Sequence, residues 1–231
     1  MGIKGFQGTS LLDFPGRIAS LVFLGGCNLS CPFCHNPALV EAPDDLPDYP
    51  LEPLFEELKQ RRNFIDGVVI SGGEPTLYPE LLPLMQRIKS MGLQVKLDTN
   101  GLLPEVLSDV LQQGLVDLVA LDLKTSPGRY RELHNRSVDS AALARSVALL
   151  LQGSVACEFR TTCVPGLVLE DDILQLGTLL RGAQSWVLQQ FVPHYSLAES
   201  YRVLEPYPVS RLEKFAELAR EFVPKVVLRG V

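Results

Sequence analysis

Short runs of apolar, β-favouring residues alternate along the chain with segments in which apolar residues recur at helical spacing. In segment 51–62, for example, Leu51, Leu54, Phe55 and Leu58 follow the i, i+3, i+4, i+7 pattern of a helix with one buried face. Strands are predicted at 18–24, 68–71, 95–98, 116–122, 155–163, 186–192 and 226–228. Helices are predicted at 51–62, 79–91, 104–113, 140–152, 171–181 and 210–222, with left-handed glycine caps at 92, 114 and 153.

This alternation of strand and helix, at a period of about thirty residues, predicts βαβ units and a parallel sheet with right-handed crossovers. The periodicity leaves open whether the sheet is doubly wound or forms a barrel. In either architecture the chemistry collects at the carboxyl ends of the strands. Glu74, Asp98, Asp122 and His194 each lie at or just beyond the end of a predicted strand, which marks that edge as the candidate site.

The size and charge of the chain narrow its class. With 231 residues, of which 46% are hydrophobic, it is expected to form a single domain over 1–231, and the helix and strand after about residue 205 are its least typical part. A net charge of −6 without an extended basic stripe argues against nucleic acid as a partner. No apolar run approaches the length of a membrane span or signal segment, so a cytoplasmic location is expected.

Three cysteines form a CxxxCxxC triplet at Cys27, Cys31 and Cys34, directly after the predicted strand 18–24. A cubane iron–sulfur cluster has four iron corners, so three protein thiolates leave one iron open to a ligand that is not protein. The triplet therefore indicates a cluster that performs chemistry, whereas a fully ligated cluster is usually an electron carrier.

Other interpretations of the triplet remain open at this stage. Adjacent His35 would complete a three-cysteine, one-histidine zinc site, although neighbouring ligands rarely complete one tetrahedron. A disulfide fits poorly with an odd total of five cysteines and no secretory segment. An electron-transfer protein would need the cluster and no further cofactor site.

The triplet, with an aromatic residue before its third cysteine, resembles the signature of radical S-adenosylmethionine (SAM) enzymes. The CHNP continuation narrows the resemblance to enzymes that activate glycyl-radical enzymes, and among these to the activating proteins of anaerobic ribonucleotide reductase. The blocks that match, in order, are LDFPG at 12–16, CHNP at 34–37, SGGEP at 71–75, LDTNG at 97–101, LDLK at 121–124 and RTT at 160–162. The match spans about residues 3 to 195.

The resemblance implies an α/β fold of the radical SAM type, an open partial (β/α)6 barrel. It implies one [4Fe–4S] cluster on the three cysteines and SAM on the fourth iron. The activity implied is reductive cleavage of SAM, followed by removal of a glycine Cα hydrogen from a partner protein, so that a glycyl radical forms there.

Cofactor-binding residues are expected around the cluster. Paired glycines Gly72 and Gly73 permit a ligand to approach the backbone closely, and Glu74 suits a cationic amino group, which in the family is that of SAM. Phe33 is expected against the cluster or the adenine, unless it is an ordinary core aromatic. His194 is either a structural hydrogen-bonding residue or, by the resemblance, a SAM contact.

The remaining candidates are charged residues on strands. Asp122 and Lys124 share one face of a strand, and such a buried pair is costly without further partners. Arg160 is expected to meet the SAM carboxylate, which turns Cys157 and Cys163 toward the helices as buried hydrophobes. The resemblance also implies a monovalent cation at Asp98, Thr99 and Asp122.

The expected partners follow from the resemblance. Anaerobic ribonucleoside-triphosphate reductase is the preferred substrate protein, and pyruvate formate-lyase or another glycyl-radical enzyme comes next. An electron donor such as flavodoxin or ferredoxin is expected to reduce the cluster. A radical SAM enzyme that acts on a small molecule would share the cluster and SAM motifs but need an enclosed pocket.

Overall fold

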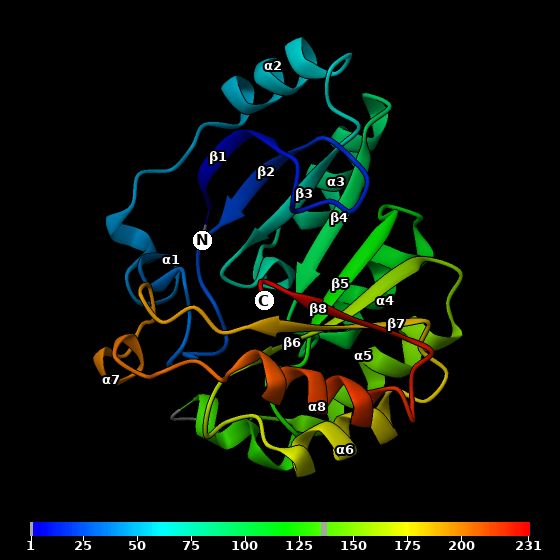
Figure 1. Ribbon diagram of the computed structural model, residues 1–231. Helices are drawn as coiled ribbons and strands as arrows, with labels where there is room; N and C mark the ends of the chain where they lie inside the picture. Colours follow the sequence, from blue (N-terminus) through cyan, green and yellow to red (C-terminus); the bar gives the residue numbers. More distant parts are fainter. Residues whose placement is uncertain (1, 135–137) are drawn as a thin grey trace. The chain divides into compact units, whose positions relative to one another are not determined.

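The computed structural model describes residues 2–134 and 138–231; the rest of the predicted domain 1–231 lies outside the described residues. The fold is α/β, with strands in the order of the sequence from β1 to β8 and no pairing of β8 with β1 among these residues (Figure 1). The strands are β1 (Ile3–Ser10), β2 (Ala19–Leu24), β3 (Gly67–Gly72), β4 (Gln94–Thr99), β5 (Leu118–Asp122), β6 (Ala156–Cys163), β7 (Ser185–Gln190) and β8 (Lys225–Arg229). The expectation of an α/β fold with an open sheet is confirmed.

Helices follow most strands, as predicted. The α-helices are α1 (Pro37–Glu41), α2 (Leu51–Arg61), α3 (Leu81–Ser90), α4 (Pro104–Gln112), α5 (Ser140–Gln152), α6 (Glu170–Leu179), α7 (Glu199–Arg202) and α8 (Val209–Ala219). Short 3₁₀ helices are η1 (Pro43–Asp45), η2 (Pro75–Leu77) and η3 (Pro127–Leu133). The six long helices agree with the predicted ones to within three residues at each end, and the short ones lie in segments without apolar periodicity.

Strand β1 is the element that the sequence pattern did not predict. It pairs antiparallel with β2, and its register shifts twice, between Ile3 and Gly5 and between Gln7 and Ser10. Two glycines and the polar residues of IKGFQGTS break the alternation by which a strand is recognised. Only the pairing with β2 reveals this edge strand.

The described residues form two compact units. Unit 1 lies within residues 1–28, 38–99 and 105–119, and unit 2 within 29–37, 100–104 and 120–231. In unit 1, β2, β3 and β4 are parallel, in one-to-one register from Ala19 opposite Gly67 onward. Its core includes a cluster of Phe14, Ala19, Leu21 and Val69, against which Phe23 packs.

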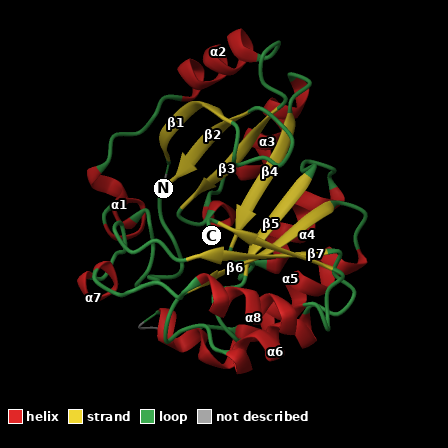
Figure 2. Cartoon of the chain, in the orientation of Figure 1, coloured by secondary structure: helices red, strands yellow, loops and turns green. Residues whose placement is uncertain are grey.

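In unit 2, β6, β7 and β8 are parallel, and α8 packs against α6, β7 and β8 (Figure 2). The core of this unit is aromatic, with Phe159, Trp186 and Phe215 fully buried. The indole Nε1 of Trp186 donates to Thr161 Oγ1 at 3.1 Å, so the single tryptophan carries no unsatisfied donor into the core.

Two local expectations need correction. Gly92 and Gly114 have the positive φ of left-handed caps, +80° and +64°, but Gly153 has φ −78° and ends α5 in an extended conformation. In α2 the buried stripe is Leu54, Phe55 and Leu58, whereas Leu51 is 42% exposed. Leu51 is the first residue of the helix, and its side chain lies outside the buried stripe.

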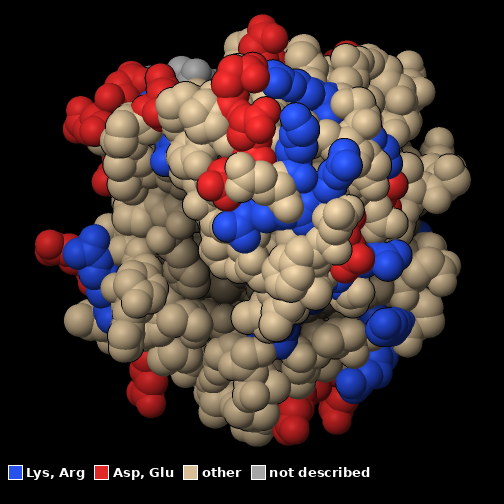
Figure 3. Space-filling model, turned by 90° about the horizontal axis from the view of Figure 1, so that it is seen from above, with Lys and Arg blue, Asp and Glu red and all other residues tan. Residues whose placement is uncertain are grey.

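The described residues contain no helix long and apolar enough to span a membrane. On the face drawn in Figure 3, Lys and Arg side chains lie next to Asp and Glu side chains.

Candidate active site

The cysteine triplet begins just beyond β2. Cys27 belongs to unit 1, whereas Cys31 and Cys34 belong to unit 2, where the amide of Cys34 donates to the carbonyl of Cys31 at 2.9 Å in a tight turn. Cys31 is buried and Cys34 half-buried, and all five cysteines of the chain are thiols, with no disulfide. The thiol state leaves each sulfur available to a metal.

Within 2–134 and 138–231, no three His, Cys, Asp or Glu side chains are close enough together to hold a metal ion. The ligand set Cys27, Cys31 and Cys34 therefore stays a prediction of the sequence, as does the zinc alternative. In the zinc alternative His35 would be the fourth ligand, but its Nε2 is hydrogen-bonded to the carbonyl of Val192 at 2.8 Å.

The cysteine loop, defined here as residues 29–37, is tied to the end of η3. The amide of Ser30 donates to the carbonyl of Leu133 at 3.2 Å, and its hydroxyl lies 2.9 Å from His134 Nδ1. On the same 3₁₀ helix, the buried Tyr130 hydroxyl accepts a hydrogen bond from the amide of Lys124 at 3.0 Å. Burial raises the pKa of Tyr130, so its phenol stays neutral.

A charged triad lies where β5 and β6 end. Asp122 accepts from Arg160 Nε at 2.7 Å and from Lys124 Nζ at 3.0 Å. Burial by itself raises the pKa of Asp122, but the charges and hydrogen bonds of Arg160 and Lys124 outweigh it and hold that pKa well below its usual range. One carboxylate thus accepts hydrogen bonds from two cations.

Lys124 lies within electrostatic range of the cysteine loop. Burial lowers the pKa of Lys124, but the nearby charges of Asp122 and of Cys31 outweigh it, so the pKa of this ammonium is raised and its charge is secure. The influence of Cys31 on this pKa means that the buried thiol is close enough to Lys124 for their charges to interact. A cation at this position favours the thiolate form, which is the form that binds metals.

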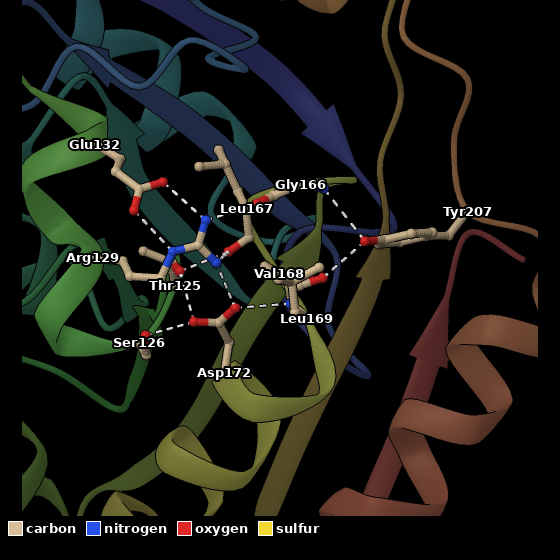
Figure 4. A network of polar contacts seen from close by, with 10 residues as sticks. All are labelled: Thr125, Ser126, Arg129, Glu132, Gly166, Leu167, Val168, Leu169, Asp172 and Tyr207. Carbon is tan, nitrogen blue, oxygen red and sulfur yellow. Dashed lines mark hydrogen bonds and ion pairs between the residues drawn. The ribbon is translucent and has the colours of Figure 1, made fainter.

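A dense polar network fixes the segment that carries Tyr130 and His134 (Figure 4). Arg129 uses all three guanidinium nitrogens: Nε and Nη2 donate to Glu132 at 2.9 Å, Nη1 to Asp172 at 2.7 Å, and Nη2 to the Gly166 carbonyl at 2.7 Å. Asp172 is nearly fully buried and also accepts from Ser126, at 2.5 Å. The network joins η3 to the start of α6, so the partners of Ser30 rest on a rigid base.

The glycine pair in unit 1 brings two strand ends into close contact. Gly72 has φ +121°, a conformation open to glycine alone, and a Cβ on Gly73 would lie 2.0 Å from the Gly26 carbonyl oxygen. The amide of Gly73 donates to Leu24 O and that of Glu74 to Gly26 O, both at 2.8 Å. The pair is therefore required for backbone packing beside the Cys27 segment, whatever ligand it also admits.

Glu74 is 1% exposed and caps the short helix η2. Its Oε1 accepts from the Thr76 amide at 3.1 Å, the Thr76 hydroxyl at 2.5 Å and the Thr99 hydroxyl at 2.7 Å. All three of these donors are neutral. The carboxylate is thus oriented by hydrogen bonds rather than neutralised by a cation among these contacts.

Asp98 has a cationic partner that the sequence analysis missed. Lys96 Nζ lies 2.5 Å from Asp98 Oδ1, and Ser71 Oγ donates to Asp98 Oδ2 at 3.3 Å. Lys96 is 1% exposed, in the middle of β4. The signal was present, because Lys96 and Asp98 stand two residues apart on a strand, the same spacing that singled out Asp122 and Lys124.

Two aromatic candidates have different environments. Phe33 is buried in the cysteine loop, which fits both a core role and a cofactor contact. His194 is exposed in the loop after β7. The imidazole that contacts this loop is His35, through Val192. The sequence pattern could not indicate this contact of His35, because its partner is a backbone carbonyl 157 residues away.

The other two cysteines occupy β6, and they differ in burial. Cys163 is fully buried, as expected, and burial raises its pKa to about 12. Cys157 is only half-buried, near the start of the strand, although burial still raises its pKa. Thiols that resist deprotonation are poor metal ligands, so these two behave as small hydrophobes.

Comparison with known proteins decides the family. The model of the Radical SAM superfamily matches residues 21–176, more than half of the 231-residue chain. The chain belongs to the radical SAM superfamily. It is an enzyme of the radical SAM oxidoreductase type, and the family implies a 4Fe–4S cluster and SAM as cofactors.

Individual relatives cover nearly all of this radical SAM enzyme. A Methanocaldococcus jannaschii protein with the provisional name glycyl-radical enzyme activating enzyme is 30% identical, over 99% of this chain and 96% of its own. The pyruvate formate-lyase 1-activating enzyme of Escherichia coli K12 is 28% identical, over 85% of this chain and 82% of its own. The enzyme is therefore related to activating enzymes over most of both sequences.

Among solved structures, Streptococcus suis SuiB bound to S-adenosylmethionine has a TM-score of 0.68 over 91% of this chain, at 17% identity. The chain spans 52% of that structure, and the likeness shows the fold alone.

The residues present fit the cofactors that the family implies. Thiols that form no disulfide include Cys31, which lies within electrostatic range of an ammonium. Arg160 and Lys124 supply cations for an anionic group, and Glu74 supplies a buried carboxylate for a cationic one. These are the donor types that a thiolate-bound cluster and an amino acid cofactor require.

Proposed function

We propose that this radical SAM enzyme is an activating enzyme, which installs a glycyl radical on a partner protein. The observation that carries the proposal is the match to the M. jannaschii protein, because it extends over 99% of this chain and 96% of the relative. A match of that extent includes the cluster loop, the cofactor motifs and the C-terminal part together. The match to the E. coli activating enzyme supports the same class.

Cys27, Cys31 and Cys34 would hold the cluster in this proposal, with SAM bound at it. When bound, and given one electron from the reductant, these cofactors would supply a 5′-deoxyadenosyl radical with release of methionine, so that hydrogen-atom transfer from a glycine Cα would give 5′-deoxyadenosine and a glycyl radical. The chain's own contribution is to position the groups and exclude side reactions. Lys124 favours the thiolate form of Cys31, and Ser30 secures the loop on Leu133 and His134.

For SAM, the proposal assigns charged contacts of both signs. Glu74 is a buried carboxylate, which suits the SAM amino group. Arg160 and Lys124 are cations, which suit the SAM carboxylate. Gly72, Gly73, Phe33 and His194 complete the proposed SAM contacts.

A monovalent cation at Asp98, Thr99 and Asp122 is a weaker part of the proposal. Each carboxylate already has a cationic partner, Lys96 for Asp98 and both Lys124 and Arg160 for Asp122. The hydroxyl of Thr99 donates to Glu74, yet its second lone pair would suit a cation. Binding of a cation would require at least one of these ion pairs to open.

For the partner, we propose anaerobic ribonucleoside-triphosphate reductase, on the block pattern of the sequence, with flavodoxin or ferredoxin as the reductant and a cytoplasmic location. Pyruvate formate-lyase is the second candidate, supported by the E. coli relative. A folded partner contributes binding energy from contacts remote from the glycine, so the intact protein should be activated far better than a short peptide.

The test is electron paramagnetic resonance on a mixture of the reconstituted enzyme, SAM, a reductant and each candidate partner. We expect a doublet whose splitting collapses when the partner's glycine is deuterated at Cα. SAM cleavage without a glycyl signal from any glycyl-radical enzyme of the same organism would contradict the activase proposal and favour a small-molecule substrate. A signal with pyruvate formate-lyase and none with the reductase would change the partner alone.

A further inference from the structure

The segment that follows β7 is bonded to the cysteine loop at two points. The carbonyl of Val192 lies 2.8 Å from His35 Nε2, and the amide of Ala198 donates to the carbonyl of Pro32 at 2.9 Å. Cys34 lies between the two bonded positions of the cysteine loop, and Ser196 lies between the two bonded positions of the other segment. The two anchors therefore hold residues 192–198 alongside the stretch that contains Cys34.

Ser196 is fully buried, and its hydroxyl has no hydrogen-bond partner among the described residues. It is the only buried side-chain nitrogen or oxygen in the described part of the chain with this property. Its backbone is satisfied, because its amide donates to Pro193 O at 3.0 Å and its carbonyl accepts from Arg202 Nε at 2.7 Å. The conformation around the hydroxyl is thus fixed while the hydroxyl itself has no protein acceptor.

Two other fully buried serine hydroxyls do have hydrogen-bond partners. Ser146 donates to the carbonyl of Gly101 at 2.6 Å, and Ser20 donates to the carbonyl of Gly8 at 2.7 Å. A buried hydroxyl without a partner costs about 1–3 kcal/mol. Such a group in a native protein calls for a partner that its own side chains do not supply.

We propose that the Ser196 hydroxyl donates a hydrogen bond to a sulfur atom of the iron–sulfur cluster or of its cysteine ligand. The inference rests on the proposed function, because it requires a cluster in the cysteine loop. Reduction adds negative charge to the cluster and its sulfurs, so a donor stabilises the reduced form more than the oxidised form. Ser196 is then a positioning residue that makes the cluster easier to reduce, which is the state that cleaves SAM.

The experiment compares wild type, Ser196→Ala and Ser146→Ala, all reconstituted anaerobically and assayed for iron and sulfide before a redox titration followed by electron paramagnetic resonance. At a fixed potential near the wild-type midpoint, the reduced-to-oxidised ratio of Ser196→Ala should fall about tenfold, which for one electron is a shift of about 59 mV. Ser146→Ala removes the same atom from a buried site bonded to Gly101 and should keep the wild-type midpoint.

Apo-protein stability gives a second readout of opposite sign. Without a cluster, Ser196→Ala removes only an unpartnered hydroxyl, so its melting temperature should equal or exceed that of wild type. Ser146→Ala loses a hydrogen bond and should melt lower. If Ser196→Ala does not fold, Ser196→Thr and Ser196→Val repeat the comparison, because these two side chains differ in the hydroxyl and match in shape.

An intact cluster with an unchanged midpoint in Ser196→Ala would overturn the inference and leave solvent as the partner of the hydroxyl. Wild-type protein that takes up no iron would instead contradict the proposed function, and the iron assay distinguishes that failure from the first.

Discussion

Two ion pairs of the same sequence spacing have different surroundings in the two units. In β4 of unit 1, Lys96 and Asp98 pair with each other, and the lysine is sealed in the core. At the end of β5, in unit 2, Asp122 pairs with Lys124 and also with Arg160 from β6, and the three side chains are 13–24% exposed. The first pair lies within one strand, whereas the second joins two strands and has Lys124 within electrostatic range of Cys31.

The difference shows how one local pattern serves two purposes. A lysine and a carboxylate two residues apart on a strand necessarily share a face. Whether the pair is neutral or charged as a group depends on what the next strand contributes, and β6 contributes Arg160. In unit 1, neutral donors from Thr76 and Thr99 orient a further buried carboxylate, that of Glu74. The predictions below address this contrast of charge.

The largest effect is expected for substitutions in the cysteine triplet. Replacing Cys27, Cys31 or Cys34 with alanine should abolish the cluster, because each supplies one of only three thiolates. Wild type should hold about four iron and four sulfide per chain after anaerobic reconstitution. Chemical assay of both elements measures this, and zinc at one per chain without iron uptake would contradict the cluster.

The next effect concerns SAM and compares the two units directly. Arg160→Gln and Glu74→Gln each remove one charged contact, worth roughly 1.5–3 kcal/mol, so SAM affinity should fall by about one to two orders of magnitude. The glutamine at 74 retains an acceptor for the Thr76 and Thr99 hydroxyls, so the fold of η2 is expected to survive. Equilibrium binding on cluster-loaded protein gives the result, and wild-type affinity in both variants would mean that SAM binds elsewhere.

A third prediction concerns pH. Because Arg160 and Lys124 lower the pKa of Asp122 in the folded state, its stabilisation is complete above the unfolded value, about pH 4, and is lost as the pH falls further. Asp122→Asn should cost about 2 kcal/mol at pH 7, less than a fully buried pair because Asp122 is 24% exposed.

Urea unfolding of wild type and Asp122→Asn at several pH values measures this difference. It should shrink once the pH falls below about 4, where the wild-type carboxylate begins to lose its advantage. A difference that grows on acidification would contradict the prediction that Arg160 and Lys124 lower the pKa of Asp122 in the folded state.

The smallest effect is expected at the cysteines of β6. Cys157→Ala and Cys163→Ala should leave the iron content at the wild-type level, because these thiols lie outside the cysteine loop. With its pKa raised to about 12, native Cys163 should resist alkylation at pH 8 and react only after denaturation. Mass spectrometry of alkylated peptides measures the reaction, and rapid labelling in the native state would contradict the burial.

Much of the fold and of the site was predictable from local patterns. Apolar periodicity located the long helices and the parallel strands, because burial of one face imposes a period on the residues that form it. The spacing of Cys27, Cys31 and Cys34, together with the glycines before Glu74, indicated the chemistry, because so few residue types can bind iron or admit a ligand to the backbone. These properties belong to short stretches of chain.

Only the tertiary structure decided which distant groups meet. Strand β1 exists through its pairing with β2, and Lys96 matters because β4 is buried on both sides. His35 and Ser196 acquire meaning from the two hydrogen bonds that bring residues 192–198 to the cysteine loop. Backbone acceptors carry no sequence signature, and burial is a property of neighbours. For that reason the sequence by itself determined the kind of chemistry, and packing determined which side chains orient it.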